Sequence, residues 1–256
     1  CAKCAPSESK EFDNLFHAVS KISSSMYPGV SALAAKKMYR KACSSLRLAL
    51  AIPEVYECAS KFSEIDFNRV TSLCLSRKMK AYLNEKLNSH DDSETGDRHP
   101  ESEDRVKCRN NLLAALAEKG VKGKDLFPHE LVEKVQGTRN TRAVELVIQG
   151  QWTAMREGVE AMVLERTKAL EAKDKLAGIV AAGPSLDLGK VIVMADVSGS
   201  MSGTPMSVSI AMGILMSEVC HPAFRDLVLT FHESPTFHNL AGLGTFAAKV
   251  RSLASA

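Results

Sequence analysis

The sequence predicts an α+α/β protein, with an α-helical domain over residues 1–176, a linker over 177–189 and a Rossmann-type α/β domain over 190–256. Two observations lead to this division. Apolar residues recur at three- and four-residue spacing through most of the first part, which is typical of amphipathic helices. From residue 191 the pattern changes to a short β-branched run, a polar turn and a helix. That order is typical of a strand–turn–helix unit in an open parallel sheet.

The amino-terminal domain is predicted to consist of short helices with short connections. The breaker Tyr27-Pro28-Gly29 separates the first two of them. Almost no strand pattern occurs in this part, so we expect stacked helix pairs, a HEAT-like helical repeat, without a clean repeat in the sequence itself. The single Trp152 is expected to anchor a core. The predicted helices cover residues 11–25, 31–50, 54–62, 66–75, 76–87, 105–119, 128–135 and 141–174.

Residues 88–104 interrupt the helical pattern as an acidic, flexible insertion. The segment has no apolar residue able to anchor it and is rich in Asp, Glu, Ser and His, so it cannot bury enough surface to fold. His90, Asp91, Asp92 and His99 could be drawn as a metal cluster. A solvated loop is the better interpretation of this composition.

The composition favours a protein that acts inside the cell. The net charge of +3 is mild, and seven cysteines are scattered, mostly singly within helical patterns. That distribution indicates reduced, buried thiols and not a disulfide framework. No apolar run approaches the roughly 20 residues that span a bilayer. We therefore expect no membrane partner and a cytoplasmic location, with an organelle as the open alternative because the chain does not begin with Met.

The most informative stretch joins a predicted strand at 191–195 to a helix that Thr204 is expected to cap. The β-branched run is typical of a strand buried on both faces. It ends at Asp196, and the turn that follows carries Ser198 and Ser200. Side chains at the carboxyl end of such a strand lie where open α/β sheets bind ligands. The elements predicted next are strands at 226–231 and 236–240, joined as a hairpin, and a helix at 246–253.

The D-x-S-x-S spacing of Asp196, Ser198 and Ser200 predicts an oxygen-only site for a hard divalent cation. Such ligands suit Mg²⁺, or Mn²⁺ or Ca²⁺, better than zinc. The single negative charge leaves the cation under-neutralised and open to a partner's carboxylate. A phosphate loop would need a Gly-Lys-Ser/Thr ending, and a nucleophile elbow would need Ser where Met201 stands between two glycines. A loop that merely caps a helix remains the alternative.

This loop resembles the metal-ion-dependent adhesion site (MIDAS) of von Willebrand factor A (vWA) domains, and Met201 fits the commonest form of that motif. The resemblance implies that Asp196, Ser198 and Ser200 are metal ligands, direct or through water. It also implies a central sheet of about six strands, for which 67 residues from position 190 are too few. We therefore expect a truncated vWA-like domain. The later Thr and Asp of the family's site are expected outside this chain, with Thr245 the only local candidate for the Thr.

A wider resemblance spans nearly all of the chain. It is carried by YRKACSSLRLALAIPEVYECASKFSEIDFNRVTS at 39–72, LFPHELV at 126–132, Gln151-Trp152, and ADVSGSMSGTPM at 195–206. These segments look like an uncharacterised family of eukaryotes and large viruses that joins a helical half to a vWA-like half. The layout is similar to the TROVE module of the Ro ribonucleoprotein autoantigen, in which a ring of helical repeats carries RNA. The resemblance implies this architecture and, by layout alone, structured RNA as a second partner.

The helical domain is locally basic, with eleven Lys and Arg against five acids over residues 30–87. A solvated helical surface is the plain interpretation. Clustered cations that contact RNA phosphates are the alternative. The candidate RNA-binding residues are Lys36, Lys37, Arg40, Lys41, Arg77, Lys78 and Lys80.

Taken together, these patterns predict a non-enzymatic binding scaffold in which a divalent cation completes its shell with an acidic residue of a protein partner. The sequence contains no recognisable nucleophile with its base, paired acid and base, or cofactor loop. Two alternatives stay open. One is an RNA-binding component of a ribonucleoprotein, and the other is a structural subunit of a large assembly with a relic metal site.

Overall fold

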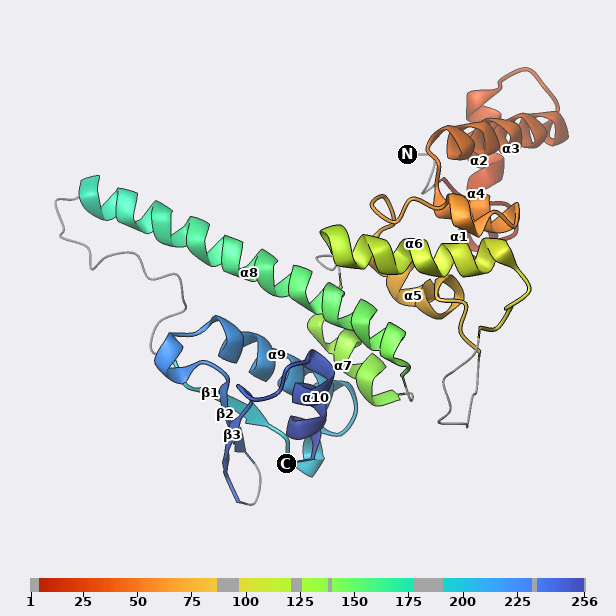
Figure 1. Cartoon of the computed structure of the whole chain (residues 1–256). Coiled ribbons are helices and arrows are strands. Elements are labelled where there is room, and N and C mark those ends of the chain that lie inside the picture. Colours follow the sequence, from red (N-terminus) through yellow and green to blue (C-terminus); the bar gives the residue numbers. More distant parts are fainter. Residues whose placement is uncertain are drawn as a thin grey trace. The chain divides into compact units, whose positions relative to one another are not determined.

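The computed structural model describes residues 5–86, 97–120, 126–137, 140–176, 191–231 and 234–255. The described residues are mainly helical, and a small mixed sheet lies near the carboxyl-terminal end (Figure 1). The prediction of helices followed by an α/β part is confirmed at this level. The predicted linker at 177–189 lies outside the described residues. No helix in the described part of the chain is long and apolar enough to cross a membrane.

The chain divides into two compact units, Cys1–Asp66 and Phe67–Ala256, and each is considered by itself. The first unit contains α1 (Glu11–Phe16), α2 (Ala18–Met26), α3 (Ala32–Ala49), α4 (Pro53–Cys58) and the short 3₁₀ helix η2 (Phe62–Glu64). The prediction of one helix over 11–25 is wrong. His17 takes a left-handed backbone, with φ 50° and ψ 38°, and separates α1 from α2. Helices α2 and α3 then pack together around Val19, Tyr39 and Cys43.

The second unit holds the remaining helices and all three described strands. They are α5 (Ser72–Tyr82), α6 (Glu103–Lys119), α7 (Pro128–Gly137), α8 (Arg142–Leu176), β1 (Val193–Asp196), η3 (Gly199–Met201), α9 (Thr204–Val219), η4 (Pro222–Phe224), β2 (Leu227–Phe231), β3 (Phe237–Asn239) and α10 (Phe246–Ala254). The prediction of two helices at 66–75 and 76–87 is wrong. Thr71 caps α5 by accepting a hydrogen bond from the Cys74 N–H at 3.4 Å, and Asn84 turns the chain beyond the helix with φ 57°.

The sheet has the strand order β1-β2-β3. Strands β1 and β2 are parallel, with Ala195 opposite Thr230 and Asp196 opposite Phe231. Strands β2 and β3 are antiparallel, so the predicted hairpin is confirmed. The parallel pair carries the ends of β1 and β2 to the same edge of the sheet, where the Asp196 loop begins.

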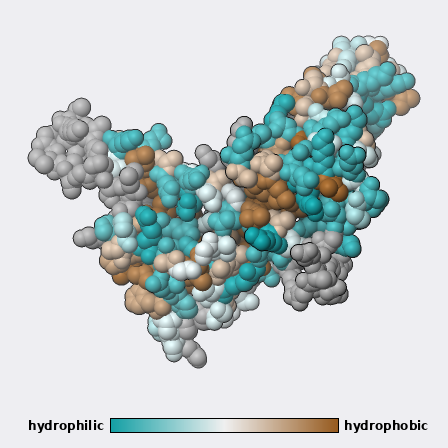
Figure 2. All heavy atoms as spheres, in the orientation of Figure 1, coloured by the Kyte–Doolittle hydropathy of each residue, from teal (hydrophilic) through white to brown (hydrophobic). Residues whose placement is uncertain are grey.

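Helix α9 covers one face of the sheet, while the opposite face is open in the described part of the chain. Ala195, Val228 and Thr230 are buried on the covered face. Met194 and Phe231 are 63% and 51% exposed on the other, so the prediction of a first strand buried on both faces is wrong. Elsewhere, too, apolar side chains reach the surface: brown patches interrupt the hydrophilic surface on the face drawn in Figure 2.

Helices α7 and α8 pack against α9 and α10, in the same compact unit as the sheet. The apolar side of α7, with Leu131, Val132 and Val135, is buried in this packing. Residues 67–176 and the sheet belong to this one compact unit, so helices before the predicted linker at 177–189 pack against elements after it. Periodicity identifies a helix and its apolar side, but it does not identify the element that covers that side.

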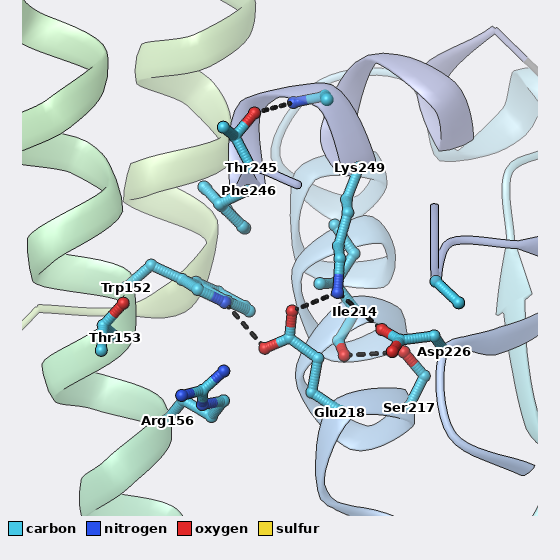
Figure 3. Close-up of polar contacts among 12 residues, drawn as sticks. Trp152, Thr153, Arg156, Ile214, Ser217, Glu218, Asp226, Thr245, Phe246 and Lys249 are labelled. Carbon is cyan, nitrogen blue, oxygen red and sulfur yellow. Dashed lines mark hydrogen bonds and ion pairs between the residues drawn. The ribbon is translucent and has the colours of Figure 1, made fainter. Parts of the chain in front are cut away.

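A buried charged network joins α8, α9, α10 and the residue before β2 (Figure 3). The Lys249 ammonium donates to Glu218 at 2.7 Å and to Asp226 at 2.6 Å. Glu218 also accepts a hydrogen bond from the Trp152 indole N–H at 2.9 Å. The Trp152 ring, 1% exposed, stacks on Phe246 with centroids 4.0 Å apart. The prediction of Trp152 as a core anchor is confirmed, and its polar edge has the partner that a buried indole needs.

Residues 97–104 do not form the flexible insertion that the composition predicts. Asp97 pairs with Arg109, and the Asn84 side chain accepts a hydrogen bond from the His99 N–H at 3.1 Å. Glu103 and Asp104 form the first turn of α6, where carboxylates are favourable beside the helix N-terminus. The rest of the predicted insertion, including His90, Asp91 and Asp92, falls within residues 87–96, outside the described residues.

The described cysteines are free, and three of them are buried: Cys43, Cys108 and Cys220. The expectation of buried thiols is wrong for Cys58, which is exposed.

Candidate functional site

The Asp196 loop lies at the carboxyl end of β1, beside the end of β2. The ladder continues one residue past the strand, because the Val197 N–H donates to the Phe231 carbonyl at 3.2 Å. The chain then makes the 3₁₀ turn η3 and reaches Gly203, whose φ of 89° suits glycine and turns the chain into α9. The loop is therefore held on one side by the sheet and on the other by a helix.

The structure brings together the three residues predicted to bind metal. The Ser198 N–H donates to a carboxylate oxygen of Asp196 at 3.0 Å. The hydroxyl oxygens of Ser198 and Ser200 are 3.0 Å apart. Asp196 and Ser198 are half-buried, whereas Ser200 is exposed. One carboxylate and two hydroxyls thus share one side of the loop, within reach of solvent.

The loop favours the ionised form of Asp196. Hydrogen bonds from the Ser198 hydroxyl and then from its backbone N–H lower the pKa of the Asp196 carboxyl, and partial desolvation opposes them only in part. A lowered pKa means that protons compete less for the carboxylate at neutral pH. The carboxylate is therefore available to a cation over the whole physiological pH range.

The donor set fits a hard divalent cation. In the described part of the chain, no Lys or Arg forms an ion pair with Asp196, so its charge is not neutralised by a neighbouring side chain. Carboxylate and hydroxyl oxygens are ligands of the kind that Mg²⁺, Mn²⁺ and Ca²⁺ accept. Among the described residues, no group of three or more His, Cys, Asp or Glu side chains could hold a metal ion. The Asp–Ser–Ser loop is a candidate site of a different composition, with one carboxylate and two hydroxyls.

The start of α9 differs from the prediction. Gly203 is the N-cap residue, and Thr204 is already inside the helix. The Thr204 hydroxyl donates to Glu133 of α7 at 3.2 Å, and the Ser207 hydroxyl donates to Gln136 at 3.4 Å. A second carboxylate therefore lies at the start of α9. Sequence reasoning missed Glu133, because 71 residues separate it from Thr204 and no local pattern links them.

Thr245, the local candidate for the later Thr of the adhesion-site motif, has another role in the structure. It is the N-cap residue of α10, and its hydroxyl accepts a hydrogen bond from the Ala248 N–H at 3.2 Å. Capping of this kind stabilises a helix by about 1 kcal/mol. The sequence could not distinguish a cap from a ligand, since both uses need a hydroxyl directly before a helix.

The candidate RNA-binding residues fall into two groups in different units. Lys36, Lys37, Arg40 and Lys41 lie on α3 of the first unit. Glu8 holds two of them, at 3.9 Å from the Lys36 ammonium and 2.6 Å from the Arg40 guanidinium. The other three, Arg77, Lys78 and Lys80, lie on α5 of the second unit and line one cavity there.

Comparisons with known proteins find similarity at both ends of the chain and along its length. Residues 1–92 match a domain of unknown function, DUF2828, and residues 190–256 match another, DUF7788. Over 248 residues the chain is 30% identical to "Uncharacterized protein L728" of Acanthamoeba polyphaga mimivirus. The chain resembles an uncharacterised family that includes a giant-virus protein.

These matches support the predicted resemblance at that coarser level. The match to the mimivirus protein covers 94% of this chain and 36% of that protein, so the chain spans about a third of that relative's length. No solved structure matches the chain. The match to DUF7788 includes the Asp196 loop and the sheet. The match to DUF2828 includes the whole first unit and α5 and ends at residue 92, which is outside the described residues.

Proposed function

We propose that this chain is a non-enzymatic binding protein that holds Mg²⁺ at Asp196, Ser198 and Ser200 and uses it to bind an acidic side chain of a protein partner. One observation carries the proposal, namely the convergence of one ionised carboxylate and two hydroxyls at the carboxyl edge of the sheet. Mn²⁺ and Ca²⁺ have the same ligand chemistry and are the alternatives. The bound ion would supply an electrostatic link between two negatively charged groups.

The charge balance favours a partner carboxylate. Asp196 supplies one negative charge, and the hydroxyls of Ser198 and Ser200 supply none, so a divalent ion would keep one unit of positive charge. A carboxylate from outside neutralises that remaining charge. The exposed position of Ser200 leaves the ion's remaining positions accessible from solvent. The role of these residues is to hold and orient the ion, and the proposal involves no covalent step.

We also infer the finer architecture. The parallel pair of β1 and β2, with α9 on one face and the loop at its carboxyl edge, supports a vWA-like domain. The helices α2 and α3, which follow each other in the chain and pack together, support a HEAT-like repeat in the first unit. The pairing of Lys36 and Arg40 with Glu8 gives no support to an RNA surface on α3.

Isothermal titration of the chain with MgCl₂ and with MnCl₂ tests the metal site. We expect one bound ion per chain, and we expect Asp196→Ala to abolish the binding because it removes the only charged ligand. Glu101→Gln is the matched control, since it removes one carboxylate from an exposed position of the same unit. Equal binding by the wild type and Asp196→Ala would contradict the site.

The partner's side of the proposal needs a separate probe. We expect N-acetyl-aspartate amide to shift the NMR signals of the amides at 197–202 in the presence of Mg²⁺ and to leave them unshifted when EDTA replaces the metal. Asp196→Ala should remove the response. Shifts of equal size with and without metal would show that the carboxylate does not bind through the ion.

A further inference from the structure

A cavity of about 360 Å³ lies between α5, α7 and the start of α8 in the second unit. Its charged lining comes from three separate stretches of the chain, at 77–85, 98 and 134. These residues are Arg77, Lys78, Lys80, Glu85, Arg98 and Lys134. Five cations and one carboxylate therefore belong to the described lining, and Lys78 is not free, since it also interacts with another group. This cavity uses none of the residues of the Asp196 loop.

Glu85 is the one acid in the described lining, and among its cations the charge of Lys80 acts on it. Glu85 accepts a hydrogen bond from the Thr141 hydroxyl, which holds the carboxylate in place. Burial raises the pKa of the Glu85 carboxyl, while the Thr141 hydrogen bond and the charge of Lys80 oppose that rise only in part. The ionised form of Glu85 is thus less favoured than that of an exposed Glu.

Two of these cations, Lys80 and Lys134, repel each other. The Lys134 ammonium is partly buried and donates to the Ser76 carbonyl at 3.0 Å, which ties α7 to α5. Burial lowers the pKa of Lys134, and the nearby positive charge of Lys80 lowers it further, against the opposing effect of Glu130. Like charges held together in a partly enclosed space have a large electrostatic free energy to gain from an anion.

We infer that this cavity binds a small anion with a diphosphate or larger phosphate group. Several negative charges on one compact group match several cations that come from different elements. Arg and Lys are the side chains that bind phosphate oxygens most strongly, through charge-assisted hydrogen bonds. The volume lies near the lower end of the range of small-molecule sites, about 300–1,000 Å³.

The surroundings favour a small ligand over RNA. Sequence-specific RNA binding uses exposed aromatic rings that stack on bases. The aromatic residues Phe67, which precedes α5, and Tyr82, its last residue, are buried and pack edge to face on each other with centroids 5.4 Å apart. Neither ring is available to a base, whereas the cations of the described lining match the phosphate part of a ligand.

Isothermal titration with inorganic pyrophosphate, in buffer with EDTA, tests the inference. We expect Lys80→Gln to weaken binding about tenfold, the loss of one strong charged contact. Glu85→Gln should instead tighten binding several-fold, because it removes the one carboxylate of the described lining and keeps an acceptor for Thr141. A merely structural role of these residues would not predict effects of opposite sign. Lys107→Gln, an exposed change on α6 outside the cavity, is the control and should bind as the wild type does.

Lys80→Gln is preferred to a change at Lys134, because the hydrogen bond from Lys134 to the Ser76 carbonyl tethers α7 to α5 and its loss could unfold the unit.

Titration with ATP and with a short RNA distinguishes the kinds of ligand. ATP that binds more tightly than pyrophosphate indicates a nucleotide ligand, and equal binding indicates recognition of the phosphate group alone. Absence of binding at millimolar pyrophosphate would overturn the inference. So would a ten-nucleotide RNA that binds and is not displaced by pyrophosphate. Asp196→Ala should leave pyrophosphate binding unchanged, so failure here is distinguishable from failure of the metal site.

Discussion

Replacement of Lys249 by Met should lower the free energy of unfolding of the second unit by about 3–5 kcal/mol, the usual cost of removing one partner from a buried ion pair. Lys249 is the only cation in the network of Figure 3 that contacts both Glu218 and Asp226. Met fills a similar volume, so the loss comes from two carboxylates left without a counter-charge. Urea unfolding followed by the fluorescence of Trp152, the only Trp in the chain, reports on this network directly.

Arg251→Met is the matched control for this prediction. Arg251 lies two residues further along α10 and pairs with Glu145 at an exposed position. Exposed ion pairs contribute about 0–1 kcal/mol, so the control should unfold at nearly the wild-type urea concentration. Equal losses in the two variants would mean that the network adds no more stability than a surface pair.

The same network predicts a dependence on high pH. Burial alone would lower the pKa of Lys249, but the hydrogen bonds from its ammonium to Asp226 and Glu218 outweigh burial and raise the pKa. A raised folded-state pKa means that the contribution of Lys249 is complete below the unfolded-state value of about 10.4 and is lost as the pH rises through the folded-state value. The stability difference between wild type and Lys249→Met should therefore be constant from pH 7 to about 10 and decrease above that. A difference that already shrinks between pH 7 and 9 would contradict the raised pKa.

Replacement of Gly213 by Leu is the second change with a large expected effect, a loss of about 3 kcal/mol from overpacking. Gly213 lets α9 approach the sheet closely. A Cβ atom at this position would lie 3.2 Å from the Cβ of Ala195 and 3.7 Å from Val228. The further atoms of Leu have no free volume there, so α9 must move away from β1. Urea unfolding should show the loss, and Mg²⁺ binding should weaken in the same variant, because β1 ends at Asp196.

Gly137→Leu makes the same substitution where space is open. A Cβ atom added at Gly137, the last residue of α7, meets nothing within 4 Å. The control should therefore change the free energy of unfolding by less than about 1 kcal/mol. If Gly213→Leu unfolds no more easily than Gly137→Leu, the close approach of α9 to β1 is not a determinant of stability.

Local patterns predicted the parts of the fold that local interactions decide. The β-branched run, the glycine-containing turn and the following helix pattern identified the position of Asp196 at the end of a strand. The strand candidates at 226–231 and 236–240, close together in the chain, identified the hairpin. Each of these signals lies within a few residues of the element it predicts.

Other features depend on residues far apart in the chain and left no local signal. The contact of Trp152 with Glu218 spans 66 residues, and the contact of Glu133 with Thr204 spans 71. The exposure of Met194 depends on what covers the sheet, not on the strand's own residues. The break at His17 lies inside a continuous amphipathic pattern, and a non-glycine residue with a left-handed backbone is uncommon enough that sequence alone gives no reason to expect it.

The central claim is that a divalent cation binds at the Asp196 loop and nowhere else with comparable affinity. Substoichiometric Mn²⁺ broadens NMR signals of nuclei close to it, so a ¹H–¹⁵N spectrum locates the ion directly. The account predicts that the amide signals of Val197, Ser198 and Ser200 are lost first, and that excess Mg²⁺ or Asp196→Ala restores them. Broadening that begins at other carboxylates, such as Glu130 or Glu101, and persists in Asp196→Ala would contradict it.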